Sequence, residues 1–327
     1  MQHWRHIQQK NFTSWKQLAT YLHWPEEETT LILKKTNHFP LNLPLRLAQK
    51  ISQNNFKDPI LKQFLPSLEE LTPHPDFLLD PVQDAYFRKA DSKILQKYSG
   101  RALLLVSSAC AMHCRYCFRK NFPYEVQRKD FFQELALLQQ DPSLKEVILS
   151  GGDPLSLSND TLKGLLTSLA SIPHLQRIRF HTRFPIGIPE RIDSDLLQIL
   201  SSNAKQIFFV LHVNHSKELD LDIFDSMKKI SQLGIPILTH TVLLKDVNDN
   251  ADTLEDLFNT LVNHSMIPYY LFHLDRVQGS SHFEVSEELG KKLMQELSTR
   301  LPGYALPRYA KEEPGKASKT LIPFSSL

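Results

Sequence analysis

All three cysteines of the chain lie in one short stretch, as Cys110, Cys114 and Cys117 in a C-x3-C-x2-C pattern. A secreted disulfide scaffold would use more cysteines and distribute them along the chain, so these thiols are predicted to be metal ligands. A cubane iron–sulfur cluster is normally held by four cysteines, so three would leave one iron open to a non-protein ligand. Tetrahedral zinc with His113 as the fourth ligand is the alternative, although His113 lies inside the tight loop itself.

A second cluster, Ser150-Gly151-Gly152-Asp153, contains a pair of glycines. Taken alone, such a pair is most often a turn. An open sheet that binds a nucleotide through these glycines is a weak alternative, because the chain has no full phosphate-loop motif here.

From residue 102 onward, β-rich runs alternate with amphipathic stretches of helical length. The β-rich runs are 102–107, 146–150, 177–182, 206–212, 235–243 and 268–274, and the helical stretches lie near 130–140, 159–171, 193–202, 217–233, 251–264 and 286–300. This alternation is typical of βαβ units and a parallel sheet. Six units are too few for a complete eight-stranded barrel, and periodicity alone fits both a doubly wound open sheet and a partial barrel.

The positions of the polar residues favour the barrel. A polar cluster follows each β-rich run: the cysteines, Ser150 to Asp153, and clusters that begin at His181, His212, Asp246 and His273. Polar groups at the carboxyl end of every strand indicate one site surrounded by βα loops. The predicted fold is α/β, a partial (β/α)6 TIM-like barrel over 96–285, with an N-terminal helical extension over 1–95 and a C-terminal helix and lysine-bearing segment over 286–327.

Composition narrows the class of protein. The 327 residues include 38 basic and 36 acidic side chains, so no broad basic field is available for nucleic acid. No run approaches eighteen apolar residues, which argues against a membrane span, and the polar N-terminus lacks the apolar stretch of a signal peptide. A cytoplasmic protein is expected. Prolines are frequent from Pro59 to Pro81, which predicts an irregular connecting segment on the surface.

The cysteine motif, with Tyr116 before its last cysteine, resembles the signature of radical S-adenosylmethionine enzymes. The resemblance implies a [4Fe-4S] cluster on Cys110, Cys114 and Cys117, whose open iron binds the amino and carboxylate groups of S-adenosylmethionine. It also implies a six-unit partial barrel and reductive cleavage to a 5′-deoxyadenosyl radical. Ser150, Gly151, Gly152 and Asp153 match the glycine-rich motif that lies near the amino group of S-adenosylmethionine in that family.

Further stretches resemble lysine 2,3-aminomutases within that superfamily. They begin at Arg101, Cys114, Ser150, Val242, Pro268 and Asp275 and keep a consistent order over residues of about 97 to 320. The resemblance implies pyridoxal 5′-phosphate as a further cofactor, bound covalently by a lysine. In the C-terminal run Pro314-Gly315-Lys316-Ala317-Ser318-Lys319, the register places Lys319 at that position, with Lys316 as the competitor. Lys97, Tyr98 and Arg101 match residues on the phosphate side of that coenzyme.

The same resemblance implies contacts with substrate and with S-adenosylmethionine. Arg119 corresponds to the arginine that binds the substrate carboxylate, and Asp275 to one of two acids that face its ε-ammonium group. The second acid maps to Glu312, with Glu313 adjacent as an alternative. His212 matches a histidine near the ribose of S-adenosylmethionine, and His240 stands where the family commonly has glutamine.

The implied function is conversion of (S)-α-lysine to (R)-β-lysine by radical 1,2-amino migration. Residues around Val277 to Gly279 and the ending Ser318-Lys319-Thr320 resemble the short branch that supplies β-lysine for modification of elongation factor P by a separate ligase. A reductant such as flavodoxin or ferredoxin is also implied. An aminomutase acting on another amino acid is the nearest alternative, but Asp275 disfavours glutamate because two carboxylates would repel. A non-catalytic iron–sulfur protein that docks on a partner is the alternative from another class.

Overall fold

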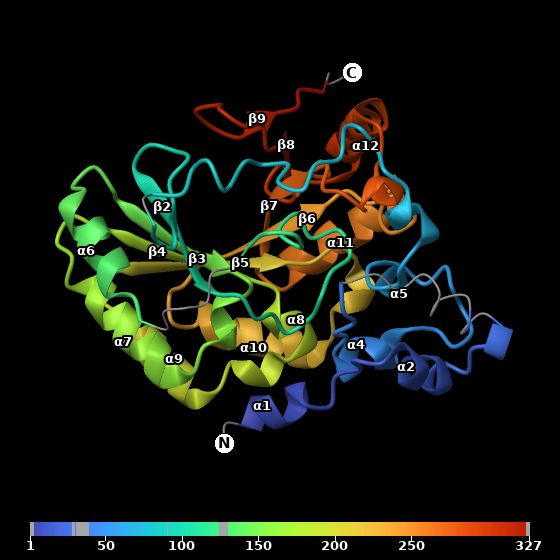
Figure 1. Cartoon of the computed structure of the whole chain (residues 1–327), viewed down its shortest axis with the longest axis horizontal. Helices are drawn as coiled ribbons and strands as arrows, with labels where there is room; N and C mark the ends of the chain where they lie inside the picture. The colour runs from blue at the N-terminus through green and yellow to red at the C-terminus, as the bar shows by residue number, and fades with distance from the viewer. Residues whose placement is uncertain (1–2, 28–29, 31–38, 90, 124–129, 325–327) are drawn as a thin grey trace.

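Nine strands form one sheet in which the order of the strands follows the order of the chain. The computed structural model describes residues 3–27, 30, 39–89, 91–123 and 130–324. The strands are β1 Ile94–Leu95, β2 Arg101–Ser107, β3 Glu146–Gly151, β4 Arg177–Thr182, β5 Gln206–His212, β6 Ile237–Val242, β7 Ile267–Phe272, β8 Arg308–Lys311 and β9 Thr320–Leu321. All pairs from β2 to β8 are parallel, and β1 and β9 add antiparallel edges at the two ends (Figure 1).

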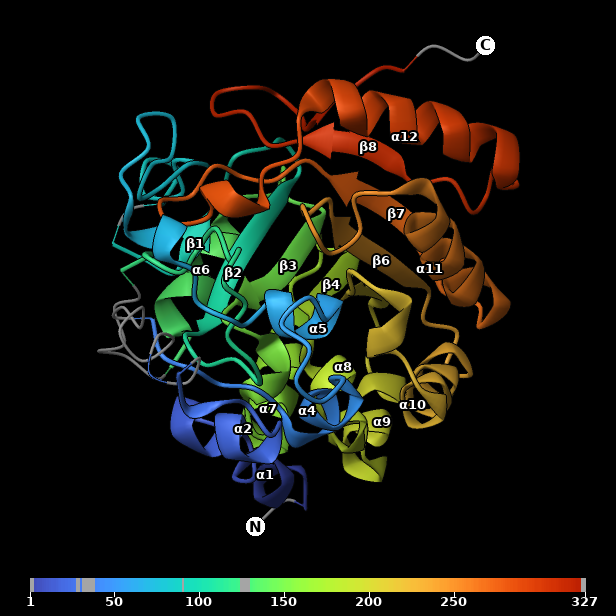
Figure 2. The ribbon, with the colours of Figure 1, turned by 90° about the vertical axis from the view of Figure 1, so that its right-hand side faces the viewer.

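Helices cover the outer side of the curved sheet, as Figure 2 shows. They are α6 Phe132–Gln140, α7 Asn159–Ala170, α9 Ser194–Ser201, α10 Leu221–Ser231, α11 Ala251–Asn263 and α12 Glu287–Arg300. Five of these helices begin at a side-chain cap that accepts a backbone N–H of the first turn: Ser158, Asp193, Asp220, Asn250 and Ser286. Each such cap stabilises its helix by about 1 kcal/mol. The structure confirms the predicted partial barrel and its six strands, and β8 adds a seventh parallel strand that was not predicted.

Short helices complete the chain. They are α1 His3–Gln8, α2 Trp15–Tyr21, α4 Leu45–Lys50, α5 Pro59–Lys62 and α8 Phe184–Gly187, with 3-10 turns at Leu68–Leu71, Pro154–Ser156, Pro189–Arg191, Ser216–Glu218 and Ser281–Phe283. The N-terminal helices share one apolar core with the barrel, and the ring of Trp4 meets that of Phe184 edge to face at 5.3 Å. Within the described part of the chain, every helix is too short or too polar to cross a membrane.

The segment from Pro59 to Pro81 departs from its prediction. It begins with helix α5, capped by the carboxylate of Asp58, and its side chains Ile60, Leu61 and Phe64 are buried. Proline at the first position of a helix is favourable, because its missing N–H would have no partner there. The expectation of an irregular surface connection is therefore wrong for the first part of this segment, which packs into the barrel.

Candidate active site

One cavity of about 440 Å³ opens at the carboxyl ends of the parallel strands. All sixteen residues that the sequence marked as candidate site residues line it: Lys97, Tyr98, Arg101, Cys110, Cys114, Cys117, Arg119, Ser150, Gly151, Gly152, Asp153, His212, His240, Asp275, Glu312 and Lys319. The N-terminal segment adds Asp84, β4 adds His181, and Arg183 follows directly after β4. Five of the six predicted polar clusters contribute residues to this cavity, and the cluster that begins at Asp246 does not line it.

The N-terminal segment holds the backbone of the cysteine loop. The amide of Asn42 donates to the carbonyl of Cys110 at 3.2 Å, and the amide of Asn11 donates to the carbonyl of Ala111 at 2.8 Å. Further along, the backbone N–H of Arg115 donates to the carbonyl of Gln63 at 2.9 Å. Because these contacts come from residues far away in the sequence, the position of the loop depends on the N-terminal extension.

The thiols of this loop fit a cationic iron centre. Burial, followed by the nearby charges of Asp153 and the other cysteines, raises the pKa of Cys110 well above its ordinary value. Burial and Cys114 raise the pKa of Cys117 to about 11. The three cysteines are partly buried, and they would ionise to thiolates only beside a positive partner, which the iron of a cluster would supply. His113, the fourth ligand in the zinc alternative, directs its Nδ1 to the carbonyl of Pro40 at 3.0 Å.

The glycine pair packs directly against the start of the cysteine loop. The N–H of Gly152 donates to the carbonyl of Ser107 at 2.6 Å, and that of Asp153 donates to the carbonyl of Ala109 at 2.8 Å. Gly151 has φ +114°, a conformation that L side chains rarely adopt. The motif therefore fixes the position of the loop that carries Cys110.

Gly152→Ala is expected to reduce cluster content and to destabilise the fold by about 1–3 kcal/mol. A Cβ at this position would lie 2.4 Å from the carbonyl oxygen of Ala109 and 2.7 Å from the carbonyl carbon of Ser108, and neither backbone group can rotate away. Iron per chain after reconstitution and thermal unfolding measure the effect. Gly164→Ala is the matched control, because its Cβ meets nothing within 4 Å and alanine favours a helix. Normal iron content in Gly152→Ala would contradict the packing argument.

The carboxylate of Asp153 accepts hydrogen bonds from groups of the protein itself. It accepts hydrogen bonds from the Thr182 hydroxyl and from the backbone N–H groups of Leu155, Arg183 and Phe184. Burial raises the pKa of Asp153 to about 6 despite these donors. Its visible role is to connect the glycine-rich motif to the end of β4.

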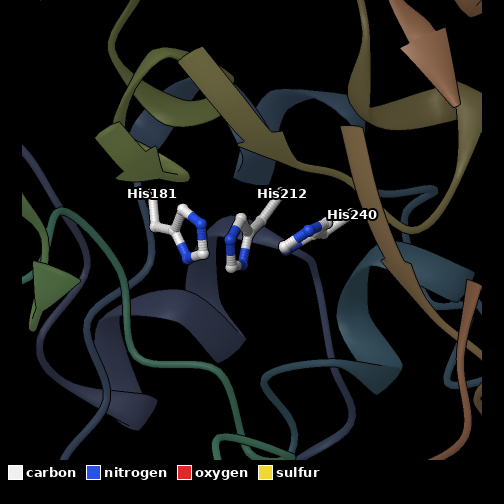
Figure 3. A group of neighbouring side chains, drawn as sticks. All are labelled: His181, His212 and His240. Atoms are coloured by element: carbon white, nitrogen blue, oxygen red, sulfur yellow. The ribbon is translucent and has the colours of Figure 1, made fainter. Parts of the chain in front are cut away.

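Three histidines from β4, β5 and β6 face one another in the cavity (Figure 3). One ligating atom from each of His181, His212 and His240 lies within 4.8 Å of the others. Their Nε2 atoms are buried and have no hydrogen-bond partner among the described residues. Burial lowers the pKa of all three, to about 3 for His212, and nearby arginines add to the effect. Neutral imidazoles with unused nitrogens fit a ligand that offers hydroxyl or ring-nitrogen groups, such as the adenosyl group of S-adenosylmethionine.

Lys319 reaches the cavity from the segment between β8 and β9. Its Nζ donates to Glu312 Oε2 at 2.7 Å and lies 4.9 Å from the ring centroid of Phe272. The hydroxyl of Tyr98 donates to Glu312 Oε1 at 2.6 Å, and Lys97 lies 3.8 Å from the same oxygen. The cavity is thus lined by the amine of Lys319, by the cations Lys97 and Arg101, and by the rings of Tyr98 and Phe272. These groups fit an aromatic aldehyde that carries a phosphate, such as pyridoxal phosphate.

Lys316 and Glu313, the alternatives to Lys319 and Glu312, lie outside the cavity. Lys316 is exposed and does not line the cavity, and Glu313 lies 3.8 Å from Lys311 outside it. The geometry therefore favours Lys319 and Glu312, although Glu312 is paired with Lys319 in this structure. Burial opposes ionisation of Glu312, but Lys319 and Tyr98 outweigh it and lower the pKa of that carboxyl.

Asp84 was not predicted from the sequence. Its carboxylate is 1% exposed and pairs with Lys97 at 2.8 Å and with the Nε of Arg119 at 2.7 Å. Arg119 also donates from Nη1 to the Ser150 hydroxyl at 3.2 Å. Burial would raise the pKa of Asp84, but the two cations outweigh it and lower that pKa. This carboxylate thus joins the arginine expected to bind substrate to the lysine expected to lie near the coenzyme phosphate.

Asp275 also lines the cavity, but its pKa is raised, whereas that of Asp84 is lowered. Burial, followed by the charge of Glu312, raises the pKa of Asp275 to about 7, against the opposing effects of Lys319 and Lys97. An acid with this pKa favours an added cation, because a nearby positive charge would stabilise its ionised form. The ammonium group of a substrate would provide that charge.

Comparisons with known proteins agree with this site. A family model described as a 4Fe-4S single cluster domain matches residues 99–179, which include the cysteines and the glycine pair. The chain is 41% identical to an L-lysine 2,3-aminomutase of Escherichia coli, over 86% of this chain and 83% of that protein. It is 35% identical to an L-lysine 2,3-aminomutase of Haemophilus influenzae, over 98% of this chain and 95% of that protein. A solved radical SAM methyltransferase from Sphaerobacter thermophilus has a TM-score of 0.47 and 16% identity, over 66% of this chain and 68% of that one. On the strength of the sequence relatives, the chain belongs to the L-lysine 2,3-aminomutase family of radical S-adenosylmethionine isomerases.

Proposed function

We propose that this protein is an L-lysine 2,3-aminomutase that converts (S)-α-lysine to (R)-β-lysine with a [4Fe-4S] cluster, S-adenosylmethionine and pyridoxal phosphate. The observation that supports the proposal is that two sets of residues line one cavity, one fit for the cluster and S-adenosylmethionine and one fit for pyridoxal phosphate. The cysteine loop and the histidines lie on strands β2 to β6, and Lys319 with its acidic partner faces them from the C-terminal hairpin.

Cys110, Cys114 and Cys117 would hold the cluster, and His212 and His240 would contact the adenosyl group. With S-adenosylmethionine bound, the cluster would supply a 5′-deoxyadenosyl radical for hydrogen-atom abstraction. The role of the protein is to position the reacting carbon beside that radical and to exclude other hydrogen donors. A cavity whose polar walls are buried suits this role.

Lys97, Tyr98 and Arg101 would bind the phosphate of the coenzyme, and Lys319 would supply the amine that attaches it. Pyridoxal phosphate would supply an electron-accepting ring there. An amine must lose its proton before it acts as a nucleophile. Glu312 Oε2, at 2.7 Å from Lys319 Nζ, is placed to accept that proton.

Charge would select the substrate. Arg119 would bind the α-carboxylate through its planar guanidinium, while Asp84 keeps the guanidinium in position from the Nε side. Asp275, and Glu312 once Lys319 has moved, would face the ε-ammonium. A second carboxylate at that end of the substrate would be repelled, so lysine is favoured over glutamate.

The proposed use of the product, the electron donor and the compartment rest on the similarity of motifs. β-Lysine would supply modification of elongation factor P by a separate ligase, a flavodoxin or ferredoxin would deliver the electron, and the reaction would take place in the cytoplasm.

The test is anaerobic reconstitution with iron, sulfide and pyridoxal phosphate, followed by reductant, S-adenosylmethionine and L-lysine. We expect 5′-deoxyadenosine and β-lysine by mass spectrometry, with the R isomer after chiral separation. The matched control replaces all three cysteines with alanine and should give neither product. Deoxyadenosine without β-lysine would reject lysine as the substrate. Neither product, from protein shown to hold both cofactors, would reject catalysis.

A further inference from the structure

We propose that Arg183 and Glu218 set the reduction potential of the cluster through Cys114, with Arg183 raising it and Glu218 lowering it. The proposal rests on the proposed function only in that it takes Cys114 as a cluster ligand. It assigns a role to two buried charges outside the predicted site.

Arg183 follows the end of β4 and reaches the cysteine loop. Its Nη1 donates to Cys114 Sγ at 2.8 Å and also contacts the hydroxyl of Tyr116. Its Nη2 donates to Gln63 Oε1 and to Glu218 Oε2, both at 2.7 Å. The guanidinium therefore lies between a sulfur atom on one side and a carboxylate on the other.

The partners of Arg183 are held in place. Glu218 and Gln63 are both 0% exposed. Glu218 Oε1 accepts from Gln63 Nε2 at 3.0 Å and from the backbone N–H of Asn214 at 3.1 Å, and Asn214 Nδ2 donates to Gln63 Oε1 at 3.0 Å. A network in which each member is held by the others rigidly fixes the charge beside Cys114.

The effect on potential follows from the charge change on reduction. One electron from an external low-potential donor makes the cluster and its thiolates more negative, and no covalent bond forms or breaks. A charged donor to a ligand sulfur stabilises the reduced form more than the oxidised form, which raises the potential. Glu218, on the far side of Arg183, has the opposite effect at a longer distance. Because Arg183 and Glu218 are both buried, solvent screens their charges less than it would screen charges at the surface.

The experiment is a redox titration of the cluster-loaded protein with dithionite and mediators, followed by electron paramagnetic resonance. S-Adenosylmethionine is left out, because Arg183 also lines the cavity and its contact with that ligand would confuse the result. The variants are Arg183→Gln, Arg183→Lys and Glu218→Gln, each compared with wild type at equal iron and sulfide content. Arg179→Gln is the matched control, since it removes another buried arginine that pairs with an acid, Glu146, at the start of β3.

We expect Arg183→Gln to shift the potential negative, Arg183→Lys to shift it less, and Glu218→Gln to shift it positive. Arg179→Gln should move it by a small part of the Arg183→Gln shift. Unchanged potentials, or shifts of one sign in both Arg183→Gln and Glu218→Gln, would overturn the proposal. If no Arg183 variant holds a cluster, an unchanged potential in Glu218→Gln would also overturn it. A wild-type protein that binds no cluster would instead reject the proposed function.

Discussion

Replacing Lys319 with alanine is expected to reduce β-lysine formation by about 10³-fold or more, because the variant lacks the amine that is proposed to attach the coenzyme. Lys319 carries the amine that the structure places in the cavity beside Glu312 and Phe272. Cluster content should stay normal, since the cysteines belong to the loop after β2 and not to the segment that carries Lys319. Absorbance of lysine-bound coenzyme and iron per chain separate the two effects.

Lys316→Ala is the matched control for that prediction. Lys316 is exposed and belongs to the same run of residues, so its removal should leave coenzyme binding and turnover near wild-type values. If Lys316→Ala lost activity while Lys319→Ala kept it, the attachment point would be Lys316.

Asp275→Asn is expected to weaken lysine binding and, at the same time, to stabilise the ligand-free protein at pH 8. The pKa of Asp275 is raised to about 7 in the folded state, from an ordinary value of 3.8. The folded protein therefore holds this proton more tightly than the unfolded chain does, and stability falls as pH rises from about 4 to about 7. Asparagine removes that cost, which is about 2–4 kcal/mol.

Lysine binding should change in the opposite direction. The neutral amide cannot pair with the ε-ammonium, so KM for lysine should rise by about 30-fold or more. In wild type, KM should also rise below pH 7 as Asp275 gains its proton, and Asp275→Asn should lose this dependence on pH. Thermal unfolding at pH 5 and pH 8, with steady-state kinetics, measures both effects.

Glu313→Gln is the control for the Asp275 experiments, because this neighbouring acid does not line the cavity. It should leave both KM and the difference in unfolding temperature between pH 5 and pH 8 unchanged. An Asp275→Asn variant with wild-type KM would show that the ε-ammonium binds elsewhere.

Much of the site could be predicted because its positions depend on local patterns. The β-rich runs from 102 to 274 became the strands β2 to β7, and parallel strands bring their carboxyl ends to one edge. Polar residues that follow each run therefore had to meet. The resemblance then supplied roles that geometry alone does not give, such as the choice of Lys319 among many lysines.

Contacts between distant parts of the chain could not be predicted. Asp84 is buried only because Lys97 and Arg119 neutralise it, and Arg119 lies 35 positions away. Gln63 is buried in a proline-rich stretch because Glu218, 155 positions later, receives its hydrogen bond. The strand β8 has only four residues, so its sequence pattern is too short to distinguish it from a loop.

The hairpin formed by β8 and β9 has a consequence for how the enzyme can evolve. Its strands pair through Ala310 with Leu321 and Lys311 with Thr320, so Glu312 and Lys319 lie at the two ends of the connecting loop. On the proposed function, residues 312–319 would therefore carry both the point of cofactor attachment and one wall of the substrate pocket. The radical source is encoded separately, in the loops after β2 and β3. On the proposed function, a change in the length or sequence of this one loop would reshape one wall of the substrate pocket, while the cysteine loop stays as it is.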